Sequence, residues 1–159
     1  MGYLSFNMPS LLDALVLGFG GIFYALTALV FFLRAYEKTE LELSLKIVFS
    51  VQFIPFCILL IVNLYLGQVR QAVTLLPMVT FLGYDYWYRV YTERKPVHHP
   101  DRWPRELVVY LVLLFAGSIG VNWYGYLVSE LYGTMLVVSF FAMMGAYSLY
   151  QYRHNKGKQ

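Results

Sequence analysis

Residues 11–33, LLDALVLGFGGIFYALTALVFFL, decide the fold class of this chain. After Asp13 the segment contains no charged residue, and it is long enough to cross a membrane, which takes about 20 residues as a helix. No basic residue precedes it and no clear small-residue cleavage site follows it. We therefore predict a retained transmembrane helix rather than a secretory signal.

Four further apolar segments follow along the 159-residue chain. Together they predict an all-α integral membrane protein, a single transmembrane domain over residues 1–159 with spans at 11–33, 45–66, 72–88, 107–128 and 131–150. The third span is the weakest, because its apolar part is short and its end carries Asp85. An alternative therefore has four spans and an interfacial third segment. Only 13% of the residues are charged, against about 25% in a soluble domain.

The basic residues predict the orientation of the bundle. Cytoplasmic loops hold the excess of Lys and Arg near the ends of spans. With five spans, residues 34–46, residues 89–105 and the C-terminal tail share one side and hold all but one of the 12 basic residues; Arg70 is on the other side. We predict a multi-pass protein of the plasma membrane with its N-terminus outside and its C-terminus inside. The inner basic residues would attract anionic lipid head groups.

Tyrosine and tryptophan residues gather near the predicted span ends. Such rings, apolar with one polar tip, are typical of a belt at each membrane interface. The predicted outer belt contains Tyr3, Tyr65, Trp123, Tyr124, Tyr126 and Tyr132, and the inner belt contains Tyr36, Tyr84, Tyr86, Trp87, Tyr88, Tyr91, Tyr147, Tyr150 and Tyr152. The same mixture of rings and basic groups does not indicate nucleic-acid binding, because the basic groups flank spans.

Small residues in three spans predict helix contacts, since helices in lipid associate by close packing at such positions. The positions are Gly18, Gly21, Ala25 and Ala28 in the first span, Gly117 and Gly120 in the fourth, and Ala142 and Ala146 in the fifth. We predict that these three spans form the tight centre of the bundle. The alternative is that Gly and Ala are simply common in membrane helices.

The second and third spans each contain an interior proline, Pro55 and Pro77, which removes a helical hydrogen-bond donor. Gln52 and Asn63 lie on nearly one face of the second span. These features suit either a polar passage between the two spans or hydrogen bonds that hold the helices together.

Asp85 is the first candidate for binding a ligand or a proton, because a charged group within a span is costly and often functional. Arg89 follows four residues later, where the two side chains can meet on a helix. The alternative is that the pair marks the membrane boundary. His98, His99 and Asp101 are weak metal candidates, since adjacent histidines in an extended loop point in different directions. No metal and no other cofactor is expected.

Several catalytic classes are excluded by the residues present. No histidine lies within a predicted span, which excludes a bis-histidine haem, and no phosphate-binding loop or GxSxG elbow is present. The first hypothesis is therefore a non-catalytic accessory or scaffold subunit that binds other membrane subunits or itself. The second is a small oligomeric transporter or channel with a path near the Pro55 and Pro77 helices. The third is a membrane-embedded enzyme acting on lipid at the cytoplasmic face.

Overall fold

The computed structural model describes residues 10–36, 51–88 and 104–156. Within these ranges the chain forms five helices and no strand, which confirms the all-helical fold class. The helices are α1 (Leu11–Ala35), α3 (Phe53–Tyr65), α4 (Val69–Tyr86), α5 (Pro104–Val128) and α6 (Glu130–Lys156).

Three of these helices are long and apolar enough to cross a membrane: α1, the Val108–Val128 part of α5, and α6. They indicate a membrane protein. The helix α3 is apolar but has 13 residues, so it is about 20 Å long. The 18-residue helix α4 does not belong to the three, in line with the weak apolar pattern of its sequence.

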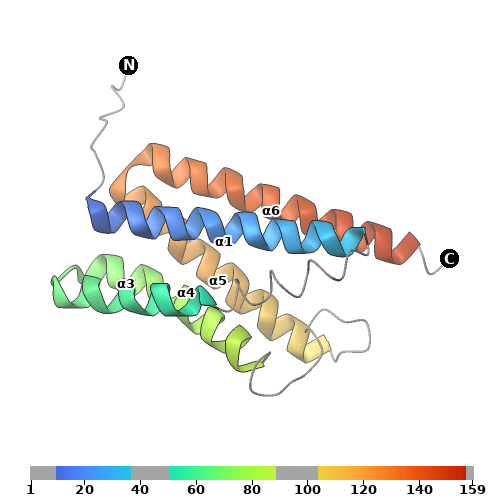
Figure 1. Cartoon of the computed structure of the whole chain (residues 1–159), viewed down its shortest axis with the longest axis horizontal. Coiled ribbons are helices and arrows are strands. Elements are labelled where there is room, and N and C mark those ends of the chain that lie inside the picture. Colours follow the sequence, from blue (N-terminus) through green and yellow to red (C-terminus); the bar gives the residue numbers. More distant parts are fainter. Residues whose placement is uncertain (1–9, 37–50, 89–103, 157–159) are drawn as a thin grey trace.

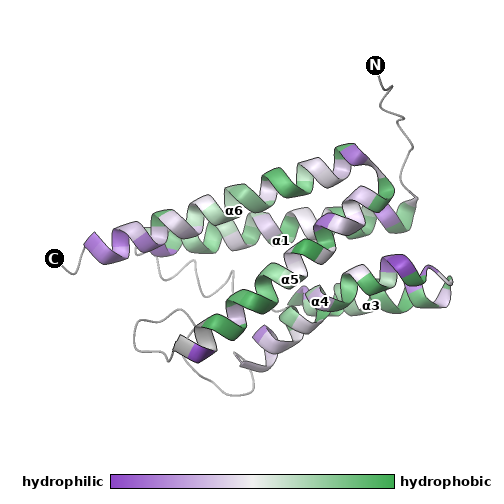
Figure 2. Cartoon of the chain, turned by 180° about the vertical axis from the view of Figure 1, so that it is seen from behind, coloured by the Kyte–Doolittle hydropathy of each residue, from purple (hydrophilic) through white to green (hydrophobic). Residues whose placement is uncertain are grey.

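Successive helices run in opposite directions, as Figure 1 shows. The helix α1 packs along α6, α3 and α4 form a hairpin, and α5 crosses the bundle in contact with both α4 and α6. One end of the bundle contains the start of α1, the α3–α4 turn and the α5–α6 turn. We call it the Asp13 end. The opposite end, with the last residues of α1 and α6 and the start of α5, is the Lys156 end. Figure 2 shows apolar residues along the helices and hydrophilic residues mostly toward their ends.

Local sequence signals place two of the helix boundaries. The helix α1 begins after Ser10, whose Oγ accepts a hydrogen bond from the Asp13 backbone N–H at 3.1 Å, while Asp13 Oδ2 accepts one from the Ser10 backbone N–H at 3.2 Å. This reciprocal pair is a capping box. The turn between α3 and α4 contains Gly67 with a φ of 71°, a conformation that costs glycine little.

The two prolines differ in position. Pro77 lies inside α4, as predicted. Pro55 lies in the first turn of α3, which begins at Phe53 after a turn at Gln52. The missing N–H of Pro55 breaks no bond within α3, because donors in a first helical turn have no intrahelical partner. Residues 45–50 of the predicted second span lie outside the described residues, so the prediction that Pro55 lies in the interior of that span stays a prediction.

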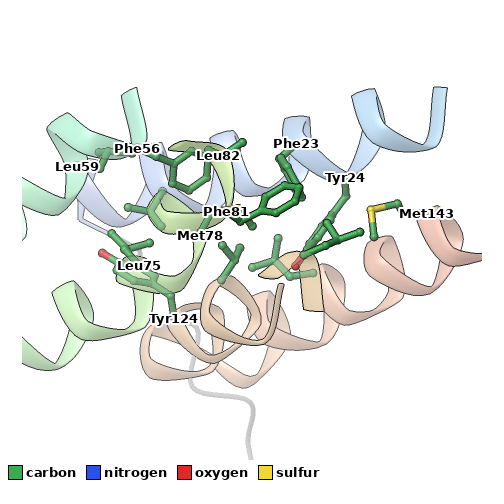
Figure 3. Close-up of a cluster of buried hydrophobic side chains, with 14 of the residues drawn as sticks. Phe23, Tyr24, Phe56, Leu59, Leu75, Met78, Phe81, Leu82, Tyr124 and Met143 are labelled. Atoms are coloured by element: carbon green, nitrogen blue, oxygen red, sulfur yellow. The ribbon is translucent and has the colours of Figure 1, made fainter. Parts of the chain in front are cut away.

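Aromatic side chains join α1 to the α3–α4 hairpin. Phe23 of α1 is fully buried, and its ring centroid lies 5.9 Å from that of Phe81 in an edge-to-face arrangement. The rings of Phe19 and Phe56 are 6.5 Å apart in a similar geometry. Figure 3 shows Phe23, Phe81 and Met78 in the middle of this cluster. The core is thus built from large rings.

Of the three spans predicted to form the tight centre, the first and the fourth both pack on the fifth, since α1 and α5 each contact α6. The helix α5 packs mainly on α4 and α6, and makes little contact with α1. A Cβ added at Gly18 or Gly21 would meet nothing within 4 Å in the described part of the chain, and Ala25 is exposed. Gly20, between the two predicted glycines, faces Val121 of α5 instead. The large rings on the other side of α1 fill the core and turn this small-residue face outward.

The small residues of α5 do make close contacts, but their partner is α4. A Cβ at Gly117 would lie 3.1 Å from the Met78 Cα, and one at Gly120 would collide with the Thr74 carbonyl oxygen. The helices α5 and α6 approach at Gly125, where a Cβ would lie 3.0 Å from the Gly133 Cα. Of the remaining small residues predicted to make helix contacts, Ala142 of α6 is exposed, whereas Ala146 of α6 and Ala28 of α1 are half-buried.

Candidate functional site

Buried polar side chains are the first candidates for function in an apolar bundle, because burying them is costly unless they are hydrogen-bonded. The buried polar or charged residues in the described ranges are Thr27, Gln52, Asn63, Asp85 and Ser118. Asn63 lies at the Asp13 end, Thr27 and Ser118 lie near the middle of the bundle, and Gln52 and Asp85 lie where α3 begins and α4 ends.

At the Asp13 end, polar groups from three helices meet. The Tyr124 hydroxyl of α5 donates a hydrogen bond of 2.8 Å to Asp13 Oδ1 of α1. The side chain of Asn63, in the last turn of α3, is within hydrogen-bonding reach of the same hydroxyl. Tyr124 and Asn63 are both fully buried, and Asp13 is half-buried. We call these three residues the Asp13 cluster.

The Asp13 cluster contains an unsatisfied acceptor. Asn63 donates from Nδ2 to the Leu59 carbonyl oxygen at 2.8 Å, whereas its Oδ1 is buried and has no hydrogen-bond partner among the described residues. The second Asp13 oxygen, Oδ2, accepts from the Ser10 hydroxyl at 2.6 Å. Leaving a buried acceptor unpaired costs about 1–3 kcal/mol, so the Asn63 oxygen is a feature that needs a physical explanation.

In the middle of the bundle, the hydroxyl of Tyr24 links α1 to α5. It lies 3.1 Å from the Ser118 carbonyl oxygen and 3.0 Å from Asn122 Oδ1, and its one hydrogen is shared between these acceptors. Thr27 donates to the Phe23 carbonyl oxygen at 2.8 Å within its own helix. This level is explained by helix packing.

Where α3 begins and α4 ends, Gln52 and Asp85 are buried, with 5% and 2% of their surfaces exposed. Asp85 lies in the last turn of α4, and Gln52 precedes α3. The Phe53 ring stacks on Tyr86 at 6.0 Å, so these two helix ends are side by side. The predicted partner Arg89 lies outside the described residues, and so do His98, His99 and Asp101.

Gln52, Asn63 and Asp85, which the sequence predicts as candidates, are all buried. The structure separates Asn63 from the other two by the length of α3. The prediction of Tyr124 as an interfacial ring is wrong, because it is fully buried against Asp13. The belt prediction does fit other rings of the same end, since Tyr65, Trp123 and Tyr126 are exposed. In the described ranges no group of three or more His, Cys, Asp or Glu side chains could hold a metal ion.

A second feature is the outward side of α1. Its exposed residues recur at alternating steps of four and three: Leu11, Leu15, Gly18, Ile22, Ala25, Leu29 and Phe32. We call this the α1 outer face. Alternating steps of four and three are the spacing along which two helices pack as a coiled coil. Two positions of this face, Gly18 and Ala25, carry small residues, whereas Phe32 is large. The two small residues leave room for another helix.

Comparison with family models, curated proteins and solved structures finds no match for this chain. Function is therefore inferred from the molecule itself, beginning with the α1 outer face.

Proposed function

We propose that this protein is a non-catalytic accessory or scaffold subunit of a larger membrane complex, and that the α1 outer face binds a transmembrane helix of another membrane protein. The observation that carries this proposal is the position of Gly18 and Ala25 on this face and of Gly21 beside it. These small residues lie away from the rest of the described chain, and nothing would meet a Cβ at either glycine within 4 Å.

Exposure of apolar side chains is not sufficient for this proposal, because lipid tails are as apolar as Leu. The small residues give the α1 outer face its distinct character. Several other glycines of the bundle lie where backbones approach closely, as at Gly120 against Thr74 and at Gly125 against Gly133, whereas Gly145 of α6 is open like Gly18. On α1 the equivalent room is unused within the described chain. A second helix would gain van der Waals contacts there that lipid supplies less well.

We further propose five spans, with the N-terminus outside the plasma membrane and the C-terminus inside. The placement of charge in the described helices supports this orientation. Arg34, Arg105, Arg153 and Lys156 are all at the Lys156 end, while Arg70 is at the Asp13 end. An excess of basic residues marks the cytoplasmic side.

The orientation is tested with single cysteines introduced at Tyr65 and at Lys156 in a Cys57→Ala background. Both side chains are exposed, at opposite ends of the bundle. We expect a membrane-impermeant maleimide added to intact cells to label Tyr65→Cys, and to label Lys156→Cys only after permeabilisation. The reverse pattern would contradict the proposed orientation.

The α1 outer face is tested by Gly18→Leu. We expect the variant to keep the thermal stability of the isolated protein within about 0.5 kcal/mol of the wild type, since the site is open. The affinity of the same variant for the partner should fall roughly tenfold or more, because a buried clash at a close helix contact costs about 1–3 kcal/mol. The readout is the mass and composition of the assembly extracted in mild detergent.

Ala142→Leu is the matched control, because it places the same leucine side chain at another exposed small residue, on α6. It should retain the partner, whereas Ala25→Leu on the α1 outer face should release it. A complex that survives both Gly18→Leu and Ala25→Leu would overturn the proposed contact. An assembly containing only copies of this chain would overturn the role as an accessory subunit.

A further inference from the structure

The last turn of α6 extends beyond the apolar part of the helix. The 27 residues of α6 make it about 40 Å long, whereas the hydrocarbon core of a membrane is about 30 Å thick. The last turn contains Arg153, His154 and Lys156, and the side chains of Arg153 and Lys156 are exposed. These two cations therefore lie at the depth of the phospholipid head groups when the apolar residues 131–150 occupy the hydrocarbon.

The Arg153 guanidinium is held on an aromatic ring of the neighbouring helix. Its Cζ lies 4.0 Å from the ring centroid of Tyr36, the residue that caps the C-terminal end of α1. The Tyr36 ring in turn lies against Phe32, at 4.6 Å between centroids. A cation–π contact fixes the position of a guanidinium without using a hydrogen-bond acceptor. The N–H donors of Arg153 therefore remain for another partner.

No acidic side chain supplies that partner in the described part of the chain. Within residues 10–36, 51–88 and 104–156, neither Arg153 nor Lys156 forms a hydrogen bond or an ion pair with a carboxylate. Basic residues in a last helical turn compensate the negative end of the helix dipole, which accounts for their charge. It does not account for the position of Arg153 on the end of α1. Lys156 follows three residues after Arg153, so the two side chains are neighbours on the helix surface.

We infer that Arg153 and Lys156 bind the phosphate of an anionic phospholipid where α1 and α6 end side by side (Figure 1), with Tyr36 positioning Arg153. A phosphate accepts two parallel hydrogen bonds from a guanidinium and attracts an ammonium as a point charge. The choline of a zwitterionic head group would bring a positive charge next to these cations, whereas an anionic head group brings none. The exposed rings of Phe32 and Tyr36 beside the cations would contact the lipid rather than water.

The experiment measures lipid bound to the purified full chain in mild detergent by native mass spectrometry. It compares phosphatidylglycerol with phosphatidylcholine of the same chain length, and we expect tighter binding of phosphatidylglycerol. Arg153→Gln should weaken that binding about fivefold, the usual contribution of one basic residue at a membrane surface. Tyr36→Leu keeps every charge and should also weaken it, because Arg153 is no longer held in place. The isolated chain is used, so the result does not depend on the partner of the α1 outer face.

Arg105→Gln is the matched control, since it removes an exposed arginine at the same end of the bundle, at the start of α5. It should bind phosphatidylglycerol as the wild type does. Equal losses in Arg105→Gln and Arg153→Gln would show a diffuse attraction and overturn the site, and an unchanged affinity in Tyr36→Leu would overturn the positioning of Arg153. Equal binding of the two lipids would leave Arg153 to an acidic group of a partner protein. A melting temperature raised as much by inorganic phosphate as by phosphatidylglycerol would overturn the assignment to lipid.

Discussion

Gly120→Ala is expected to lower the free energy of unfolding by about 3 kcal/mol, at the upper end of the usual cost of overpacking. A Cβ at this position collides with the Thr74 carbonyl oxygen of α4 and lies 3.7 Å from the Pro77 Cδ. Neither obstacle is the free end of a flexible side chain. The backbones of α4 and α5 must move apart, and the contacts next to them, such as Gly117 on Met78, are weakened with them.

Gly18→Ala is the control for this prediction, because a Cβ there meets nothing within 4 Å. Alanine is also the better helix former, so this variant should be as stable as the wild type or slightly more stable. The measurement is thermal unfolding in detergent, followed by size-exclusion chromatography of the soluble fraction. Equal losses in the two variants would contradict the close α4–α5 crossing.

Phe23→Ala is expected to cost about 3 kcal/mol, the second large effect. The Phe23 ring is fully buried and makes edge-to-face contacts with Phe81 and Tyr24, at 5.9 and 5.5 Å between centroids. Truncation leaves a cavity whose lining loses its van der Waals partners. In lipid these lost contacts supply most of the effect, since little apolar surface is transferred from water.

Phe32→Ala is the corresponding control, because the Phe32 side chain is 45% exposed on the outward side of the same helix. Lipid can occupy the space that its ring leaves, so we expect a loss below about 1 kcal/mol. Both variants are compared by thermal unfolding in the same detergent. A loss for Phe32→Ala as large as that for Phe23→Ala would show that the described core does not carry the stability.

The helices were largely predictable from the sequence because each is marked by local signals. The predicted fifth span, residues 131–150, corresponds to α6, and Asp13 lies one turn after Ser10, which is the spacing of a capping box. The weakness of the third span was also visible, in the short apolar run before Asp85. These features depend on residues within a turn or two of one another.

The composition of the candidate site was not predictable in the same way. Asp13 and Tyr124 are 111 residues apart and belong to different helices, so no spacing in the sequence connects them. Asn63 was selected as a polar residue in a span, but its neighbours were not identified. The residues 89–103, which hold Arg89 and the histidine pair, lie outside the described structure, and their predicted roles stay predictions.

The sequence by itself determined that this protein is helical and suited to a membrane, because apolar length and backbone hydrogen bonding leave a chain in lipid few other structures. Only the tertiary structure decided which side of each helix faces the core. Nearly every side of α1 is apolar, so hydrophobicity does not select one. The packing of Phe23 and Tyr24 selects it, turns Gly18 and Ala25 outward, and brings Asp13 to Tyr124.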